Sequence, residues 1–244
     1  MRIIDAHCHL GIGVDKRLEP EKLLRIMDEA GVHTSVICPI EQYIAVDNEE
    51  GNKYIYDIVK KYNGRFAGFC SVNPWYLDKA AAMLRAAFEA GFAGLKLNPK
   101  LQGFTLCDDI VNPLIEICEE YKAPVYFHTG TMICAEPFQL RELAVRYPGV
   151  NFIMGHSGNT DFWTDIAYST LGHANIYLET SHNLNIRMLI DAAGIDHVVF
   201  GSNMPRSHQL FELGKIRDLS LPDKDFSKLC GGNIEMILRK LGAT

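Results

Sequence analysis

Features that mark membrane, nucleic-acid-binding and secreted proteins are missing from this sequence. No apolar run approaches the roughly 20 residues that a membrane-spanning helix needs. The formal net charge is -6 at pH 7 and no run of Lys and Arg forms a basic face, so we expect no nucleic-acid or membrane partner. No signal-peptide pattern is visible where Met1-Arg2-Ile3-Ile4 leads into Asp5 and His7.

The cysteines also argue against an oxidising compartment. There are 7 of them, an odd number, and no Cys-x-x-Cys pair occurs. Several lie in apolar, strand-like segments such as VICPI and GFCSV, where a reduced cysteine behaves as a small hydrophobe. We therefore expect free thiols and a cytoplasmic protein.

What the sequence does contain is a repeated alternation of short apolar runs and amphipathic stretches. With 244 residues, 48% of them hydrophobic, a large core can form. The expected strands are Ile3–His7, Thr34–Pro39, Arg65–Val72, Ala93–Asn98, Pro124–His128, Asn151–His156, Asn175–Thr180 and His197–Asn203. The expected helices are Pro20–Ala30, Asp78–Ala90, Asp109–Tyr121, Glu136–Tyr147, Asp161–Leu171, Asn185–Ala193, Gln209–Leu219 and Asp225–Leu241.

This alternation predicts an α/β fold, a single (β/α)8 TIM barrel that occupies residues 1–244 as one domain. An open, doubly wound parallel sheet is the alternative, which is less favoured because no glycine-rich phosphate loop follows the first strand. The loops after the strands are short, the longest being Gln42–Gly51 and Lys100–Asp108. A small-molecule substrate fits such loops better than a macromolecule, and a homodimer is one option for the assembly.

Histidines gather where a barrel performs its chemistry, at the carboxyl ends of its strands. His7 and His9 end the first expected strand, His128 the fifth and His156 the sixth. Alternate residues of a strand share one face, so we expect His7 and His9 to point together into the barrel mouth, with Asp5 below them. Imidazoles from two strands can hold a metal such as Zn2+.

The order and spacing of several motifs resemble those of the amidohydrolase superfamily. The resemblance is closest to its amidohydrolase-related branch, which includes aminocarboxymuconate-semialdehyde decarboxylase and related hydrolases, and it covers nearly the whole chain. The motifs are DAHCHL at Asp5–Leu10, LLRIMDEAGV at Leu23–Val32, GLKLNP at Gly94–Pro99, RYPGVNFIMGHSG at Arg146–Gly158, FGSNMP at Phe200–Pro205 and GGNIEMIL at Gly231–Leu238.

The resemblance implies one divalent metal, zinc first, with manganese or iron as alternatives. It implies that His7, His9 and His128 are metal ligands and that His156 acts on the water beside the metal. The strand-eight position is an Asp in the family, where it binds the metal and often takes the proton of the water, but here it is Asn203.

An amide at that position leaves three alternatives open. An Asn oxygen can still coordinate a metal weakly, but it cannot accept a proton as a base. His156, whose unperturbed pKa of about 6.5 suits the task, could then be the base. The protein could instead bind metal with little or no activity, or the substitution could serve to trap a substrate.

Three further polar residues are candidates for contact with substrate. Lys96 lies near the end of the fourth expected strand, where some relatives carry a carbamylated lysine that bridges two metals. A structural or substrate-binding ammonium, paired with Asp5 or with a substrate carboxylate, is favoured here. Arg206 is the best-placed cation for a substrate carboxylate, and His182 follows strand seven. For Arg206 a solvated loop charge is the simpler interpretation.

Three functions therefore compete. The first is hydrolysis of a small ester, lactone or amide with His156 as base. The second is non-oxidative decarboxylation or another lyase reaction at the same metal, and the third is a weakened or silent metal or ligand binder. The related metal-dependent deoxyribonucleases rank low because they usually carry a Glu where this chain has Lys96.

Overall fold

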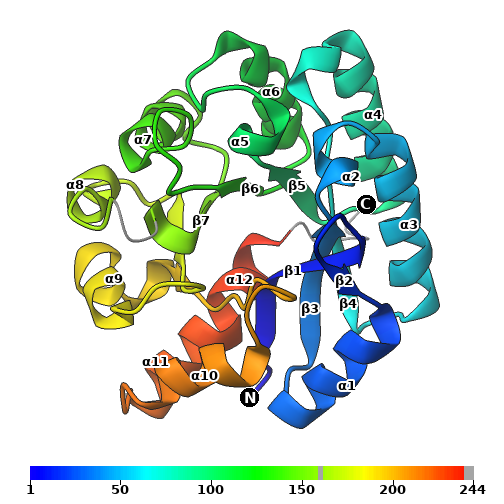
Figure 1. Ribbon diagram of the computed structural model, residues 1–244. Helices are drawn as coiled ribbons and strands as arrows, with labels where there is room; N and C mark the ends of the chain where they lie inside the picture. Colours follow the sequence, from blue (N-terminus) through cyan, green and yellow to red (C-terminus); the bar gives the residue numbers. More distant parts are fainter. Residues whose placement is uncertain (159–161, 239–244) are drawn as a thin grey trace.

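The computed structural model describes residues 1–158 and 162–238, and these fold into a barrel of strands surrounded by helices (Figure 1). The strands are β1 (Ile4–Ile12), β2 (Arg17–Leu18), β3 (Thr34–Pro39), β4 (Phe66–Cys70), β5 (Gly94–Leu97), β6 (Val125–His128), β7 (Phe152–Gly155), β8 (Ile176–Glu179) and β9 (Val198–Val199). Strand β2 forms an antiparallel hairpin with β1. Every other pairing is parallel: β1 pairs with β3, and from β3 to β9 each strand pairs with the next one in the chain.

Backbone hydrogen bonds join the end of the sheet to its beginning. The amide of Ala6 donates to the carbonyl of Phe200 (2.9 Å), and the amide of His9 donates to that of Met204 (2.8 Å). The amide of Asn203 donates to the carbonyl of His7 (2.8 Å). The eight parallel strands therefore close on themselves, which confirms the expected barrel over the open sheet.

Helices cover the outside of the barrel in the order expected for this fold (Figure 1). They are α1 (Pro20–Ala30), α2 (Gln42–Ala45), α3 (Asn48–Lys61), α4 (Asp78–Ala90), α5 (Pro99–Gln102), α6 (Asn112–Glu120), α7 (Pro137–Arg146), α8 (Ile166–Thr170), α9 (Ile186–Ala193), α10 (Gln209–Arg217), α11 (Asp223–Ser227) and α12 (Asn233–Ile237). A π-helical segment, η5 (Lys228–Gly232), joins α11 to α12, and short 3-10 turns are η1 (Pro74–Tyr76), η2 (Asp109–Val111), η3 (His156–Gly158) and η4 (Ile195–His197). None of the described helices combines the length and apolarity that crossing a membrane requires.

The core has an inner and an outer part. Apolar side chains of alternate strand positions fill the barrel itself, among them Ile4, Val36, Phe69, Tyr126 and Ile153. The opposite faces of the strands pack against the helices, as Leu95 and Phe127 do. All 7 cysteines are free.

Helix α1 shows how local signals agree with the fold. Pro20 stands in the first turn, and Gly31 caps the carboxyl end with a left-handed φ of 74°. Leu23, Met27 and Ala30 are buried toward the strands. This helix has the bounds expected from the sequence.

The sequence prediction missed α3, whose beginning was taken as part of a loop. The first five residues of α3 are polar or glycine, and its buried apolar positions Ile55 and Ile58 come only later. Gly51, a poor helix former, is required because a Cβ there would lie 2.5 Å from the Cβ of Tyr43. Tertiary packing therefore outweighs the local pattern.

Two expected helices are shorter or divided. In place of a helix from 161 to 171, the described residues form α8, and residue 161 lies outside the described part of the chain. In place of one helix from 225 to 241, the chain forms α11, η5 and α12, and residues 239–241 lie outside the described part. A Cβ on Gly231 would collide with the backbone of Arg2, so the chain changes its helical form where it packs against β1.

Candidate active site

An extra residue in β1 sets the direction of its polar side chains. Asp5 pairs with Ser35 and Cys8 with Ile37, so three steps along β1 match two along β3. As a result, Asp5 faces α10, where its carboxylate accepts hydrogen bonds from Gln209 Nε2 (2.8 Å) and Cys8 Sγ (3.1 Å). The expectation that Asp5 lies below the histidines is therefore wrong, because strict alternation does not hold across the bulge.

His7 and His9 do point together into the barrel, as expected. Their Nε2 atoms are 2.9 Å apart. His9 Nδ1 lies 2.9 Å from the carbonyl oxygen of Pro39, which can only accept, so this nitrogen carries the ring proton. His7 Nδ1 lies 2.7 Å from the hydroxyl of Tyr126.

Lys96 lies beneath the histidines and has no contact with Asp5. Its Nζ is 3.1 Å from His7 Nε2 and 3.7 Å from the ring centre of Tyr126, and the residue is buried. Burial lowers the pKa of Lys96 to about 8. The expected pairing with Asp5 is wrong because the bulge turns that carboxylate outward.

His128 and His156 form a second pair, at the ends of β6 and β7. His156 Nε2 lies 3.1 Å from His128 Nδ1, and His156 Nδ1 lies 2.8 Å from Ser181 Oγ. The ring of His182 packs edge-on against that of His156, with centroids 5.4 Å apart. His156, His182 and Asn203 all have a left-handed φ, between 55° and 64°. Such non-glycine conformations are found where the surrounding structure enforces them, often at functional sites.

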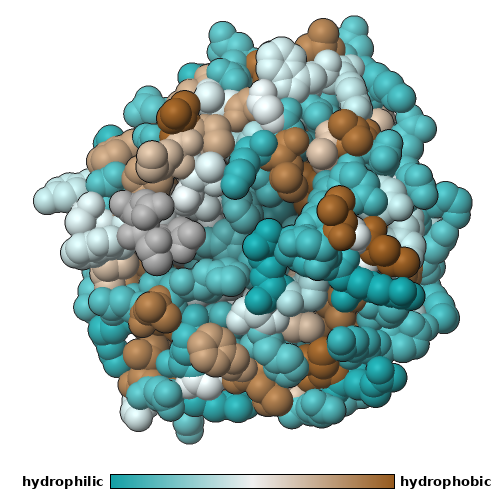
Figure 2. Space-filling view, viewed as in Figure 1, coloured by the Kyte–Doolittle hydropathy of each residue, from teal (hydrophilic) through white to brown (hydrophobic). Residues whose placement is uncertain are grey.

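A cavity of about 490 Å³ opens above these residues at the carboxyl ends of the strands. His9, His128, His156, His182 and Asn203 line its inner part. Figure 2 shows hydrophilic residues around the centre of this face of the molecule. His7 and Lys96 do not line the cavity and lie deeper in the barrel.

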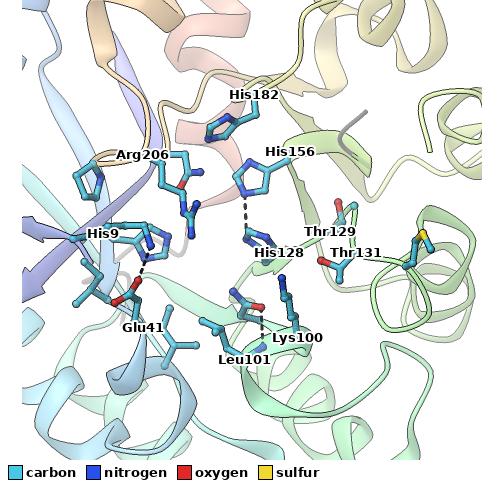
Figure 3. A pocket seen from close by; sticks show the side chains of 18 residues that line it. His9, Glu41, Lys100, Leu101, His128, Thr129, Thr131, His156, His182 and Arg206 are labelled. Atoms are coloured by element: carbon cyan, nitrogen blue, oxygen red, sulfur yellow. Dashed lines mark hydrogen bonds and ion pairs between the residues drawn. The ribbon is translucent and has the colours of Figure 1, made fainter. Parts of the chain in front are cut away.

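Cations stand at the rim of the cavity. Arg206 and Lys100 approach it from opposite sides (Figure 3), and both are exposed. Within residues 1–158 and 162–238 neither forms an ion pair, whereas Lys16, also at the rim, is paired with Glu41 (2.5 Å). As far as the described residues go, the rim therefore offers a ligand two positive charges that have no ion-pair partner.

The strand ends also hold a buried carboxylate that the sequence analysis overlooked. Glu179, the last residue of β8, is fully buried, and its side chain accepts a hydrogen bond from the hydroxyl of Tyr126 (2.9 Å). Strand alternation places Tyr126 on the face of His128, and Glu179 on that of Tyr177. This signal is readable in the sequence, because Tyr177 and Glu179 lie two residues apart in the expected strand Asn175–Thr180.

The chemistry of the donors fits a divalent metal at His7 and His9. Burial lowers the pKa of both imidazoles, that of His9 to about 3, so they are neutral, which is the form that binds metal. With the His9 proton on Nδ1, its Nε2 lone pair faces His7 Nε2, where a metal can be shared. Lys96 is a competing donor for that atom of His7.

His128 is absent from the tightest ligand groups that the described residues form around this pair. Among the described residues, two groups of three have ligand atoms within 4.8 Å of one another: His7 with His9 and Cys38, and His7 with His156 and Glu179. Neither group includes His128. The roles expected for His128, His156, His182, Asn203 and Arg206 stay predictions, although the cavity brings all five together.

Comparisons with known proteins agree with the geometry of the fold. An amidohydrolase family model matches residues 4–240. A 2,6-dihydroxybenzoate decarboxylase from Rhizobium is 16% identical, with 97% of this chain and 98% of that chain covered at a TM-score of 0.80. A dihydroxybenzoic acid decarboxylase from Polaromonas sp. JS666, solved with bound manganese and the inhibitor 2-nitroresorcinol, is 18% identical, with 97% and 96% covered and a TM-score of 0.78.

A further similar structure carries a different activity in its description. It is a proposed 2-pyrone-4,6-dicarboxylic acid hydrolase from Pseudomonas putida, 14% identical, with 97% of both chains covered and a TM-score of 0.75. At such low identity these structures show the shared fold alone. A search of the curated proteins finds no match.

Proposed function

The chain belongs to the amidohydrolase family, and from that premise we propose that it is a metal-dependent hydrolase of a small ester, lactone or amide. The match to residues 4–240 confirms the family expected from the sequence, and with it the expectation that the chain is an enzyme of that family. The reaction and its substrate are our proposal. One observation carries it: the Nε2 atoms of His7 and His9 lie 2.9 Å apart below a polar cavity with His156 in its wall.

His7 and His9 would hold the metal, and His128 and Asn203 would complete its ligands from the cavity side. We propose zinc first, because neutral imidazoles suit it, with manganese or iron as alternatives. When bound, the metal supplies Lewis-acid polarisation of the substrate carbonyl and of the attacking water.

His156 is the residue that would take the proton of the water. Its Nδ1 is held by Ser181, which leaves Nε2 directed at His128 and the cavity. Burial lowers the pKa of His156 well below its usual value, so the ring is neutral, and the same shift makes it a weaker base than an exposed histidine. Asn203 cannot share this task because an amide is not a base.

Non-oxidative decarboxylation is the second candidate, and the descriptions of two similar structures favour it. Arg206 and Lys100 can bind a substrate carboxylate, which either reaction of an acidic substrate would use. Two of the similar structures are described as decarboxylases of dihydroxybenzoates. We propose a small anionic molecule as the substrate in both cases.

The test is a screen of purified protein whose metal content is measured first. Lactones, esters and amides are assayed by acid release, and aromatic carboxylates by release of carbon dioxide. Acid release without carbon dioxide supports the hydrolase, and carbon dioxide release supports the second candidate. Stoichiometric metal without turnover of any compound would overturn both and favour a silent binder, as expected if Asn203 disables the site.

A further inference from the structure

The buried carboxylate of Glu179 lies between the two histidine pairs, and hydroxyl and backbone amide groups donate hydrogen bonds to it. Its Oε1 accepts from the backbone amide of Ser181 (2.6 Å). Its Oε2 accepts from the hydroxyl of Tyr126 (2.9 Å), the hydroxyl of Ser181 (2.8 Å) and the backbone amide of His156 (3.0 Å). Burial raises the pKa of this carboxyl group, and the hydrogen bonds act against that shift because they favour the ionised form.

Each hydroxyl joins Glu179 to one imidazole. The hydroxyl of Tyr126 is 2.7 Å from His7 Nδ1, and that of Ser181 is 2.8 Å from His156 Nδ1. A hydroxyl has one proton, and a carboxylate accepts it more strongly than a neutral imidazole does. Both hydroxyls therefore donate to Glu179, and their oxygens accept from the Nδ1–H groups of the two histidines.

We propose that Glu179 is a positioning residue that sets which ring nitrogen of His7 and of His156 carries the proton. It acts on His7 through Tyr126 and on His156 through Ser181. Both Nε2 atoms are then bare, one for a metal and the other for a proton. The use of these two atoms in metal binding and proton transfer rests on the proposed function. The proton positions themselves do not depend on it.

Two glycines at strand ends make room for this arrangement. A Cβ on Gly201 would collide with the carboxylate of Glu179, and a Cβ on Gly155 would collide with the ring and hydroxyl of Tyr126. Neither glycine has a left-handed φ, so conformational freedom does not explain them. The two glycines are explained by the space that the Glu179 carboxylate and the Tyr126 ring occupy.

The same atoms could be viewed as a metal site, since His7, His156 and Glu179 form one of the two candidate groups. The carboxylate, however, is 4.0 Å from His7 Nδ1 and 3.7 Å from His156 Nδ1. The two hydroxyls already bridge these gaps with hydrogen bonds. The oxygens of Glu179 and the two Nδ1 atoms therefore already have hydrogen-bond partners, and the group sets the positions of the ring protons instead of binding a metal.

The proton positions are measured by long-range proton–nitrogen correlation spectra of metal-free protein labelled with nitrogen-15 histidine. In the parent, His7 and His156 are expected to carry their protons at Nδ1. Tyr126→Phe should change the spectrum of His7 alone, and Ser181→Ala that of His156 alone. Tyr177→Phe and Ser71→Ala are the matched controls: Tyr177 packs against His197 instead, and Ser71 Oγ has no partner among the described residues.

Measurements of metal affinity and of kcat separate the effect of Glu179 on His7, through Tyr126, from its effect on His156, through Ser181. Tyr126→Phe should weaken metal binding by roughly ten-fold or more, as is usual when a group that orients a ligand is removed. Ser181→Ala should change metal affinity by less than about three-fold and lower kcat by roughly ten-fold or more when metal is saturating. A merely structural role would instead affect both quantities in both variants.

Specific outcomes would overturn the inference. An Nε2–H form of His7 or His156 in the parent would do so, as would spectra of both histidines that change alike in each variant. The spectra are recorded on metal-free protein, so they test the inference whether or not the parent binds metal. A parent that binds no metal would count against the proposed function and not against the proton positions. Glu179→Leu removes the acceptor of both hydroxyls, and if it leaves both proton positions unchanged the inference is wrong.

Discussion

Gly201 lies against the buried carboxylate of Glu179, and a Cβ at this position would meet the Cδ of Glu179 at 2.6 Å. The two residues come from neighbouring strand ends, after β9 and at the end of β8. The glycine of the FGSNMP motif is thus explained by a side chain 22 positions earlier in the chain.

Gly201→Ala is expected to destabilise the protein by about 1–3 kcal/mol, because the methyl group overpacks a buried site that has no room to relax. Urea unfolding measures the change. Gly214→Ala is the matched control: a Cβ there meets nothing within 4 Å, and replacing a helical glycine should stabilise by up to about 1 kcal/mol. Equal stability of the Gly201 variant and the parent would show that Glu179 moves freely.

Replacing both His7 and His9 with Ala is expected to abolish metal binding and to leave the barrel folded. The inner core packs largely below this layer, so the metal is not needed for folding. Metal analysis after dialysis and circular dichroism are the measurements. Stoichiometric metal in the double variant would contradict the assignment of these ligands, and global unfolding would make the metal structural.

Asn203→Asp is expected to tighten metal binding and raise the rate by roughly ten-fold or more, because a carboxylate adds a negative charge and a second proton acceptor. The left-handed φ of 55° at this position suits Asp as well as Asn, so no strain is added. His156→Asn in the parent should remove most activity.

The comparison uses four proteins, namely the parent, both single variants and the double variant, with metal content measured beside the rate. An Asn203→Asp variant that keeps its metal and loses activity would show that the active site needs the amide. The interpretation of Asn203 as a weakened carboxylate position would then be wrong.

Lys96→Met is expected to tighten metal binding, since it removes a buried positive charge whose Nζ lies 3.1 Å from His7 Nε2. Methionine keeps most of the length and apolar volume of the lysine chain. Equilibrium dialysis with Zn2+ compares the variant with the parent, and Lys60→Met, on the outer helix α3, is the control. Weaker binding in the Lys96 variant would instead point to a carbamylated lysine that binds metal.

Local sequence signals determined much of this protein. Pro20 and Gly31 mark the ends of α1, and the apolar runs that alternate with helices predict the barrel. The His-x-His spacing in β1 predicts that His7 and His9 share a face, because that property depends on residues two apart.

Only the tertiary structure decided the rest. The bulge in β1 that turns Asp5 toward Gln209 arises from pairing with β3, which no local pattern encodes. Helix α3 forms despite its polar beginning because Ile55 and Ile58 find a buried surface. The hydrogen bond that joins Glu179 to Tyr126 connects residues 53 positions apart, so it exists only once the barrel has closed and removed both groups from water.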